Sequence, residues 1–372
     1  TQGPMLPLAY GLLYRVWAAA GVLGGRILTA VLGLAGCCFA AGLAGRAVPA
    51  RRAPEASVMA FALTACNLYH VYFTAIPKTY ALASCLLLGG YWLLTLCLPR
   101  QMRARSNMSC MWALPAGLLV AMAAGTRLSM GALLPVTVLV LAITWRRTGA
   151  AFFWFALGGG VGLALVYGPS ILYAREQFVF SQSFHAARGG HGLMLIAGSL
   201  SRTLRAYLPV ATLMAGYAVF LFRGGCRMAR PAEAAGEESG CLWPWLWSAA
   251  FGAVFVVQMC SPFPYDDYHV PVMGLLAAAL AGRIVNGVAS ELRRGQVCLF
   301  SVLLSLAASC SSPLLQEWFV VRQDRFWAVR REIPDLALLR GVARDVRALS
   351  GGDRVLLTQD TYLAVEAGMS VP

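Results

Sequence analysis

The sequence predicts an all-α polytopic membrane protein. Hydrophobic residues make up 59% of its 372 residues and charged residues only 12%, whereas soluble domains average about 45–50% and about 25%. A helix that crosses a bilayer needs about 20 mostly apolar residues, and runs of this length recur along the chain. Too few charges remain to cover a water-exposed surface. A soluble multidomain protein, a disordered chain and a secreted disulfide scaffold are therefore excluded.

The first 23 residues differ from the runs that follow. Residues 4–20 form a shorter amphipathic stretch with Arg15 inside it, which is typical of a helix lying in the membrane interface. We therefore expect residues 1–23 to be the end of an outer loop with a juxtamembrane helix. Residues 24–314 form the expected transmembrane domain. It contains ten predicted spans: 24–45, 56–75, 80–98, 111–126, 128–145, 151–170, 204–222, 242–260, 269–288 and 297–314.

The charge pattern predicts the orientation of these spans. The net charge is +14, and basic residues are scattered singly or in pairs between apolar runs, which is typical of cytoplasmic loops and not of a nucleic-acid interface. Alternate loops hold fourteen arginines, which the positive-inside rule assigns to the cytoplasm. Both ends of the chain then lie outside. We expect a multi-pass protein of the cytoplasmic (inner) membrane of a bacterium, with its active site and C-terminal tail on the periplasmic side.

Residues 315–372 predict the start of a small α/β domain at the outer face. Apolar residues recur with helical periodicity over 335–349, and Gly351-Gly352 ends that helix. Residues 355–358 then predict a short buried strand, and 361–367 a second helix. We expect the remainder of this domain to be missing. The chain is read as a fragment that also lacks a first span and part of the first outer loop.

The eleven cysteines predict no metal site. They contain no C-x-x-C pair, and most lie within apolar runs, where cysteine acts as a small hydrophobic residue. No metal site and no cofactor are therefore predicted, although a divalent cation stays open because carboxylates occur next to each other in one loop.

That loop is the richest polar cluster. It contains two carboxylates, two tyrosines and a histidine between two predicted spans, at Tyr265, Asp266, Asp267, Tyr268 and His269. Such a group could bind a cation, orient a sugar or act as a general base. The alternative is a polar turn in which Asp267 caps the span that follows.

Other candidates lie at the same predicted face. His185 and His191 could act as ligands or acids, and Arg188 could bind a phosphate through two hydrogen bonds; the alternative is a flexible interfacial loop. Lys78 could pair with a lipid phosphate or simply extend to the interface. Arg127 lies between two predicted spans, where a cation so close to hydrocarbon needs an anion. His70 is interpreted as an interior histidine with a hydrogen-bond partner, and Gly158-Gly159-Gly160 as a site of close helix packing.

The order of several short motifs resembles the membrane glycosyltransferases with the C-type fold, in the protein-mannosyltransferase-like and aminoarabinose-transferase-like group (family 39). Each motif is weak alone, and their order and spacing carry the resemblance. The segments are Gly3-Pro4-Met5-Leu6-Pro7-Leu8-Ala9-Tyr10, Gly25-Arg26-Ile27-Leu28, Ala116-Gly117 to Gly125-Thr126-Arg127, Tyr265-Asp266-Asp267-Tyr268-His269 and Val355 to Pro372.

The resemblance implies an inverting transfer of a sugar from a polyprenyl-phosphate donor to a lipid, glycan or protein acceptor. The general base of the family is an aspartate expected upstream of Thr1. Arg127, Arg188 and Lys78 would neutralise the phosphate leaving group, and Asp266 or Asp267 would orient the acceptor hydroxyl. The expected partners are the donor, the acceptor and membrane lipids.

Two other functions remain open at this stage. A transporter or flippase of lipid-linked or small anionic substrates would use the same charges to line a path, and it predicts paired repeats with broken helices. A non-catalytic membrane scaffold would not need cations gathered on one face.

Overall fold

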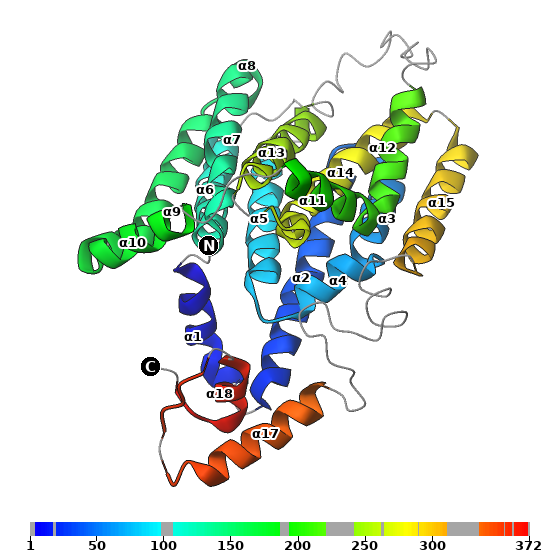
Figure 1. Cartoon of the computed structure of the whole chain (residues 1–372). Coiled ribbons are helices and arrows are strands. Elements are labelled where there is room, and N and C mark those ends of the chain that lie inside the picture. Colours follow the sequence, from blue (N-terminus) through cyan, green and yellow to red (C-terminus); the bar gives the residue numbers. More distant parts are fainter. Residues whose placement is uncertain are drawn as a thin grey trace.

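The computed structural model describes residues 4–17, 20–97, 107–186, 193–220, 242–261, 264–288, 290–310, 335–352, 354–358 and 361–370. These residues form a helical assembly (Figure 1). Within the described ranges, β pairing is limited to one parallel bridge between Val355 and Ser370. The predicted all-α class is confirmed.

The N-terminal half consists of a short helix followed by longer apolar ones. Its elements are α1 (Met5–Trp17), α2 (Gly21–Arg46), η2 (Ala50–Arg52), α3 (Ala53–Ala65), α4 (Leu68–Ala75), α5 (Thr79–Leu96), η3 (Asn107–Trp112), α6 (Ala113–Thr126), η4 (Leu128–Ala132), α7 (Leu133–Ile143), α8 (Trp145–Thr148) and α9 (Ala151–Tyr173). Helix α1 coincides with the predicted juxtamembrane helix.

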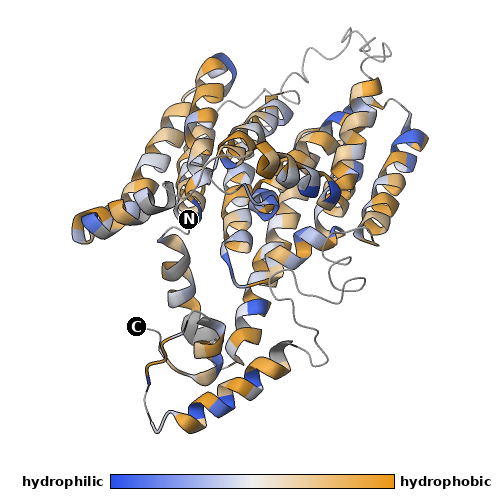
Figure 2. Cartoon of the chain, in the orientation of Figure 1, coloured by the Kyte–Doolittle hydropathy of each residue, from blue (hydrophilic) through white to orange (hydrophobic). Residues whose placement is uncertain are grey.

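The C-terminal half continues with helices of mixed length. Its elements are α10 (Arg175–Ala186), α11 (Leu193–Ala206), α12 (Leu208–Phe220), α13 (Leu242–Met259), η7 (Asp266–His269), α14 (Val270–Gly287), α15 (Glu291–Cys310), α17 (Asp335–Leu349) and α18 (Thr361–Ala367). Apolar residues run along the helices of the bundle, and polar residues gather at several helix ends and along α17 (Figure 2).

The span count is not confirmed. Each predicted span overlaps one or more helices in the described part, but only four of these helices are long and apolar enough to cross a membrane, namely Gly21–Arg46, Ala151–Tyr173, Leu242–Met259 and Asp266–Gly287. A bent pair would make five, and four further apolar helices are shorter than 18 residues.

The predicted span over 56–75 is not one straight helix but a bent pair of helices, which leaves open whether it crosses the membrane. The chain breaks between α3 and α4, which meet at an angle of 66°. Asn67 causes this break, because its side-chain oxygen accepts a hydrogen bond from the backbone N–H of His70 at 3.1 Å and so starts a new helix. Its amide nitrogen donates to the carbonyl of Ala206 at 3.0 Å, which fixes the break against the end of α11.

Glycines allow α6 and α9 to pack closely. A Cβ at Gly158 would overlap the carbonyl oxygen of Leu114, and a Cβ at Gly117 would overlap that of Phe155. A Cβ at Gly159 would lie 2.9 Å from the Leu134 side chain on α7. The interpretation of the glycine run as a helix-packing site is therefore confirmed.

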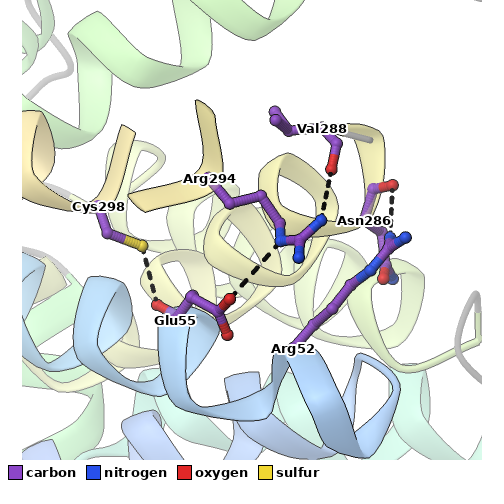
Figure 3. A network of polar contacts seen from close by, with 6 residues as sticks. All are labelled: Arg52, Glu55, Asn286, Val288, Arg294 and Cys298. Atoms are coloured by element: carbon purple, nitrogen blue, oxygen red, sulfur yellow. Dashed lines mark hydrogen bonds and ion pairs between the residues drawn. The ribbon is translucent and has the colours of Figure 1, made fainter. Parts of the chain in front are cut away.

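Arginines predicted to be cytoplasmic meet at one end of the bundle (Figure 3). Arg52 on η2 donates to the carbonyl of Asn286 at 3.2 Å, and Arg294 on α15 lies 3.6 Å from Glu55 on α3. Arg46 at the end of α2 donates to the carbonyl of Thr95 near the end of α5 at 3.1 Å. These contacts bring together loops that alternate along the chain, and the cytoplasmic assignment of this end stays a prediction.

The C-terminal helices pack at the opposite end of α2 (Figure 1). The predicted helices over 335–349 and 361–367 are confirmed, and Gly351 and Gly352 have φ values of +60° and +105° that end α17. The prediction of a buried strand over 355–358 is wrong. Val355 is 58% exposed and Leu357 is 89% exposed, because the segment pairs through one bridge and is not covered by a sheet.

Candidate functional site

Polar side chains from five elements meet at the end of the bundle opposite the arginines of Figure 3. Helices α4 and α5 contribute tyrosines, the break between α6 and η4 contributes an arginine, α13 contributes a glutamine, and η7 contributes two carboxylates and a histidine. We call this group the Arg127 cluster. It consists of Tyr69, Tyr80, Arg127, Gln258, Asp266, Asp267, Tyr268 and His269.

Arg127 occupies the point where α6 ends and η4 begins. Its backbone is extended (φ −144°, ψ 118°), and this extended residue turns the side chain inward, where it is 6% exposed. Its guanidinium carbon lies 4.8 Å from the centre of the Tyr80 ring and 4.3 Å from that of Tyr268. The Nη1 atom is buried without a hydrogen-bond partner in the described part of the chain. A buried guanidinium with an unused donor favours an anionic ligand.

The two carboxylates of η7 each bind a tyrosine from a distant helix. The Tyr69 hydroxyl on α4 donates a short hydrogen bond to Asp266, which is 2% exposed, and the Tyr80 hydroxyl on α5 donates one to Asp267. Asp267 does not cap the following helix, because α14 begins after His269 with no side-chain cap. The alternative of a simple capped turn is therefore wrong for Asp267.

Gln258 on α13 binds the backbone of η7, and His269 is the buried last residue of η7. The Gln258 side-chain amide donates to the carbonyl of Tyr268 at 2.8 Å and to the hydroxyl of Ser129 at 3.2 Å. The His269 ring is fully buried and lies 4.8 Å from the Phe255 ring. Neither of its nitrogens has a hydrogen-bond partner within the described ranges. The histidine therefore brings two unused polar atoms to the cluster.

The rings of Tyr207 and Phe73 pack against Tyr69 and hold it in place. The Tyr207 hydroxyl lies 3.2 Å from Nδ1 of His70, and the Tyr207 ring meets the Tyr69 ring edge-on with centres 5.9 Å apart. Phe73 packs on the other side of Tyr69 at 4.7 Å. This arrangement confirms that His70 is an interior histidine with a hydrogen-bond partner.

The remaining predicted site residues are Lys78, Tyr265, His185, Arg188 and His191. Lys78 immediately precedes α5 and lies two residues before Tyr80, and its carbonyl accepts a hydrogen bond from the Tyr10 hydroxyl. Tyr265 is 47% exposed and meets the Tyr268 ring edge-on at 5.3 Å. His185 lies in α10, and its side chain is not among those described. Two residues of the same prediction lie outside the described residues, Arg188 and His191.

Metal binding receives no support from the described residues. They contain no group of three or more His, Cys, Asp or Glu side chains that could hold a metal ion. The described carboxylates Asp266 and Asp267 bind tyrosine hydroxyls instead.

Sequence reasoning missed three members of the cluster. Tyr69, Tyr80 and Gln258 lie 197, 187 and 10 residues from their hydrogen-bond partners on η7. The one available signal was the position of Tyr80 at the boundary of a predicted span, beside Lys78. Nothing local distinguishes Tyr69 or Gln258 from other polar residues in apolar helices.

The fold can be compared with known proteins. It is similar to the crystal structure of ArnT from Cupriavidus metallidurans bound to undecaprenyl phosphate, with a TM-score of 0.60 and 15% sequence identity. The match covers 99% of this chain and 64% of that chain, so the present sequence spans less than two thirds of the length of ArnT. No family model and no curated protein matches the sequence. The fold implied by the resemblance to C-type membrane glycosyltransferases is thereby confirmed.

Proposed function

We propose that the protein is a membrane glycosyltransferase that moves a sugar from a polyprenyl-phosphate-linked donor to an acceptor. The observation that carries the proposal is the buried Arg127, whose guanidinium carbon lies within 4.8 Å of two ring centres and whose Nη1 donor has no partner among the described residues. The solved structure with a similar fold is bound to undecaprenyl phosphate, a ligand that carries the anion such a guanidinium would bind. The reaction would take place at the outer face of the inner membrane.

The chemistry follows from the charges of the cluster. When the bond between the sugar and the phosphate breaks, negative charge develops on the polyprenyl phosphate that leaves. Arg127 is positioned to stabilise that charge, and its low exposure strengthens the interaction because little water screens it. Lys78 would add a second cation. Asp266 and Asp267 would orient the acceptor hydroxyl. Its oxygen would attack from the face opposite the phosphate and invert the anomeric centre, while its proton would pass to the general base that the family resemblance implies.

The cluster does not identify the sugar or the acceptor. A hexose or a pentose would serve as donor sugar, and a lipid, a glycan or a protein would serve as acceptor. The proposal is therefore tested first on the shared part of every such donor, which is the polyprenyl phosphate.

The test compares Arg127, which is buried, with Arg283, which is half-buried. Both guanidinium groups lie over aromatic rings. Arg127→Gln removes the proposed phosphate ligand. Arg283→Gln is the matched control, because Arg283 lies 4.7 Å from the Trp245 ring near the opposite end of the bundle. The protein is reconstituted in liposomes, and undecaprenyl phosphate binding is measured by native mass spectrometry. We expect the first variant to lose at least about tenfold in affinity, as for a charge-assisted hydrogen bond, and the control to bind as wild type does.

Equal affinity in the two variants would contradict the phosphate role of Arg127. Binding without transfer, measured with a set of radiolabelled polyprenyl-phosphate sugars, would instead favour a transporter or flippase. The break between α3 and α4 is the observation that keeps this second candidate open, since transporters use broken helices. A scaffold would neither bind the lipid nor transfer sugar.

A further inference from the structure

The turn between α4 and α5 is held by three hydroxyl groups from three separate elements. Thr29 on α2 donates to the carbonyl of Ala75 at 3.0 Å. Tyr362 on α18 donates to the carbonyl of Pro77, and Tyr10 on α1 donates to that of Lys78, each at 3.4 Å. We call these three side chains the hydroxyl clamp. The turn is thus bound at almost every residue, and one of its partners comes from the C-terminal segment.

A short stretch of chain joins the hydroxyl clamp to the Arg127 cluster. Lys78 is the last residue before α5, and Tyr80 is the second residue of that helix. The Tyr80 hydroxyl binds Asp267, and its ring covers one side of Arg127. A shift of the turn would therefore move the start of α5 and displace both contacts.

Helix α18 is itself anchored to the bundle. The Glu366 carboxylate accepts a hydrogen bond from the backbone N–H of Val22 at 2.7 Å, at the N-terminus of α2, where a negative charge is favourable. Its second oxygen lies 3.4 Å from Nε of Arg340 on α17. Gly21 has a φ of +58°, and a Cβ there would lie 2.6 Å from the same carboxylate. Tyr362 lies one helical turn before Glu366, so both side chains face the bundle.

The Tyr10 phenol of the clamp keeps its proton. Burial and the neighbouring Tyr362 raise the pKa of Tyr10 well above its usual value. The hydroxyl of Tyr10 therefore stays a donor around neutral pH.

We infer that Tyr362 is a positioning residue. Through it, the C-terminal segment at the N-terminal end of α2 fixes the position of the turn that contains Lys78 and leads into Tyr80 on α5. The inference rests on the proposed function only where it concerns donor affinity. Its structural part, that α18 restrains the start of α5, stands on the contacts alone.

The experiment replaces one hydroxyl at a time in the full chain. Tyr362→Phe removes the clamp hydrogen bond and keeps the ring. Tyr173→Phe is the matched control, because the side chain of Tyr173 is 89% exposed. Hydrogen exchange is measured for the peptide that covers residues 80–86, together with the thermal midpoint and the affinity for undecaprenyl phosphate.

In Tyr362→Phe, we expect exchange of residues 80–86 to become about fivefold faster, as for the loss of one hydrogen bond, with the thermal midpoint lowered by less than about 3 °C. We expect the affinity for undecaprenyl phosphate to fall severalfold and the control to match wild type. Unchanged exchange in Tyr362→Phe, or an increase spread over the whole protein, would overturn the inference. Faster exchange with unchanged affinity, in a protein whose wild type binds the lipid, would overturn the link to the donor. If the wild type does not bind the lipid, the proposed function fails while the exchange result still decides the structural part.

Discussion

The guanidinium carbon of Arg127 lies 4.3 Å from the centre of the Tyr268 ring, and the Tyr80 ring covers it at 4.8 Å. Two aromatic rings thus contact a planar cation that is 6% exposed. Cation–π contacts stabilise this arrangement without using Nη1, which has no hydrogen-bond partner in the described part of the chain and remains for a ligand. Because Tyr80 also binds Asp267, the position of the arginine depends on η7 and α5 together.

Arg127→Lys should impair the site although it keeps the positive charge. A lysine ammonium is not planar and cannot offer two parallel donors to a phosphate while stacked between two rings. We expect the affinity for undecaprenyl phosphate to fall about tenfold, a loss typical of a charged hydrogen bond. Isothermal binding measurements in detergent micelles would check this. Arg283→Lys, which alters the contact with Trp245 instead, should leave the affinity unchanged. Wild-type affinity in Arg127→Lys would show that charge alone suffices.

Tyr80→Phe and Asp267→Asn should not act independently. The two side chains share one partly buried hydrogen bond, so the second substitution removes little that the first has left. A double-mutant cycle on undecaprenyl phosphate affinity should give a coupling energy of about 0.5–3 kcal/mol. The control cycle pairs Asp267→Asn with Tyr91→Phe on the same helix, whose hydroxyl lies 2.6 Å from Thr137. That cycle should be additive. Additivity in both cycles would mean that the Tyr80–Asp267 contact does not affect binding.

The sequence was most informative where a property is local. Apolar runs located the helices, the glycine pair at 351–352 located the end of α17, and the cost of a cation near hydrocarbon pointed to Arg127. It was least informative about helix length and breaks. The interruption at Asn67 depends on a contact with Ala206, which is 139 residues away, so no window around residue 67 contains its cause.

The candidate site shows the same limit. Asp266 and Asp267 were identified because adjacent carboxylates are conspicuous in an apolar chain, but their partners Tyr69 and Tyr80 were not. Tyrosines are frequent at the ends of membrane-spanning helices for reasons unrelated to catalysis, and only the packing of α4 and α5 against η7 selects these two. The prediction of a buried strand over 355–358 is wrong because apolar residues there predict burial only if a sheet covers them.

Gly158→Ala should destabilise the protein, whereas Gly160→Ala two residues later should not. A methyl group at residue 158 would overlap the backbone of Leu114 on α6, while a methyl group at residue 160 has nothing within 4 Å. Overpacking of this kind costs about 1–3 kcal/mol, and Gly160→Ala should be neutral or slightly stabilising because alanine favours helix. Thermal unfolding of both variants in the same detergent would check the difference. Equal midpoints would mean that α6 and α9 are not packed as closely as described.

Arg294→Ala should destabilise the end of the bundle shown in Figure 3, whereas Arg293→Ala should have little effect. The Arg294 side chain is 7% exposed and lies 3.6 Å from Glu55, whose side chain is 22% exposed. Removing one partner of a buried ion pair costs about 3–5 kcal/mol, because the other charge is left unpaired. The partial exposure of Glu55 lets water screen its charge, which places the expected loss at or below the lower end of that range.

The neighbouring Arg293 is exposed and provides the control for the loss of charge at this end. The double variant Glu55→Gln with Arg294→Met tests the cause, since it removes both charges and keeps most of the volume. It should recover much of the stability lost in Arg294→Ala if the unpaired carboxylate is responsible. Urea unfolding or thermal midpoints of the four proteins would measure this. If the double variant were no more stable than Arg294→Ala, the lost hydrogen bond to the Val288 carbonyl, which both variants lack, would explain the effect instead.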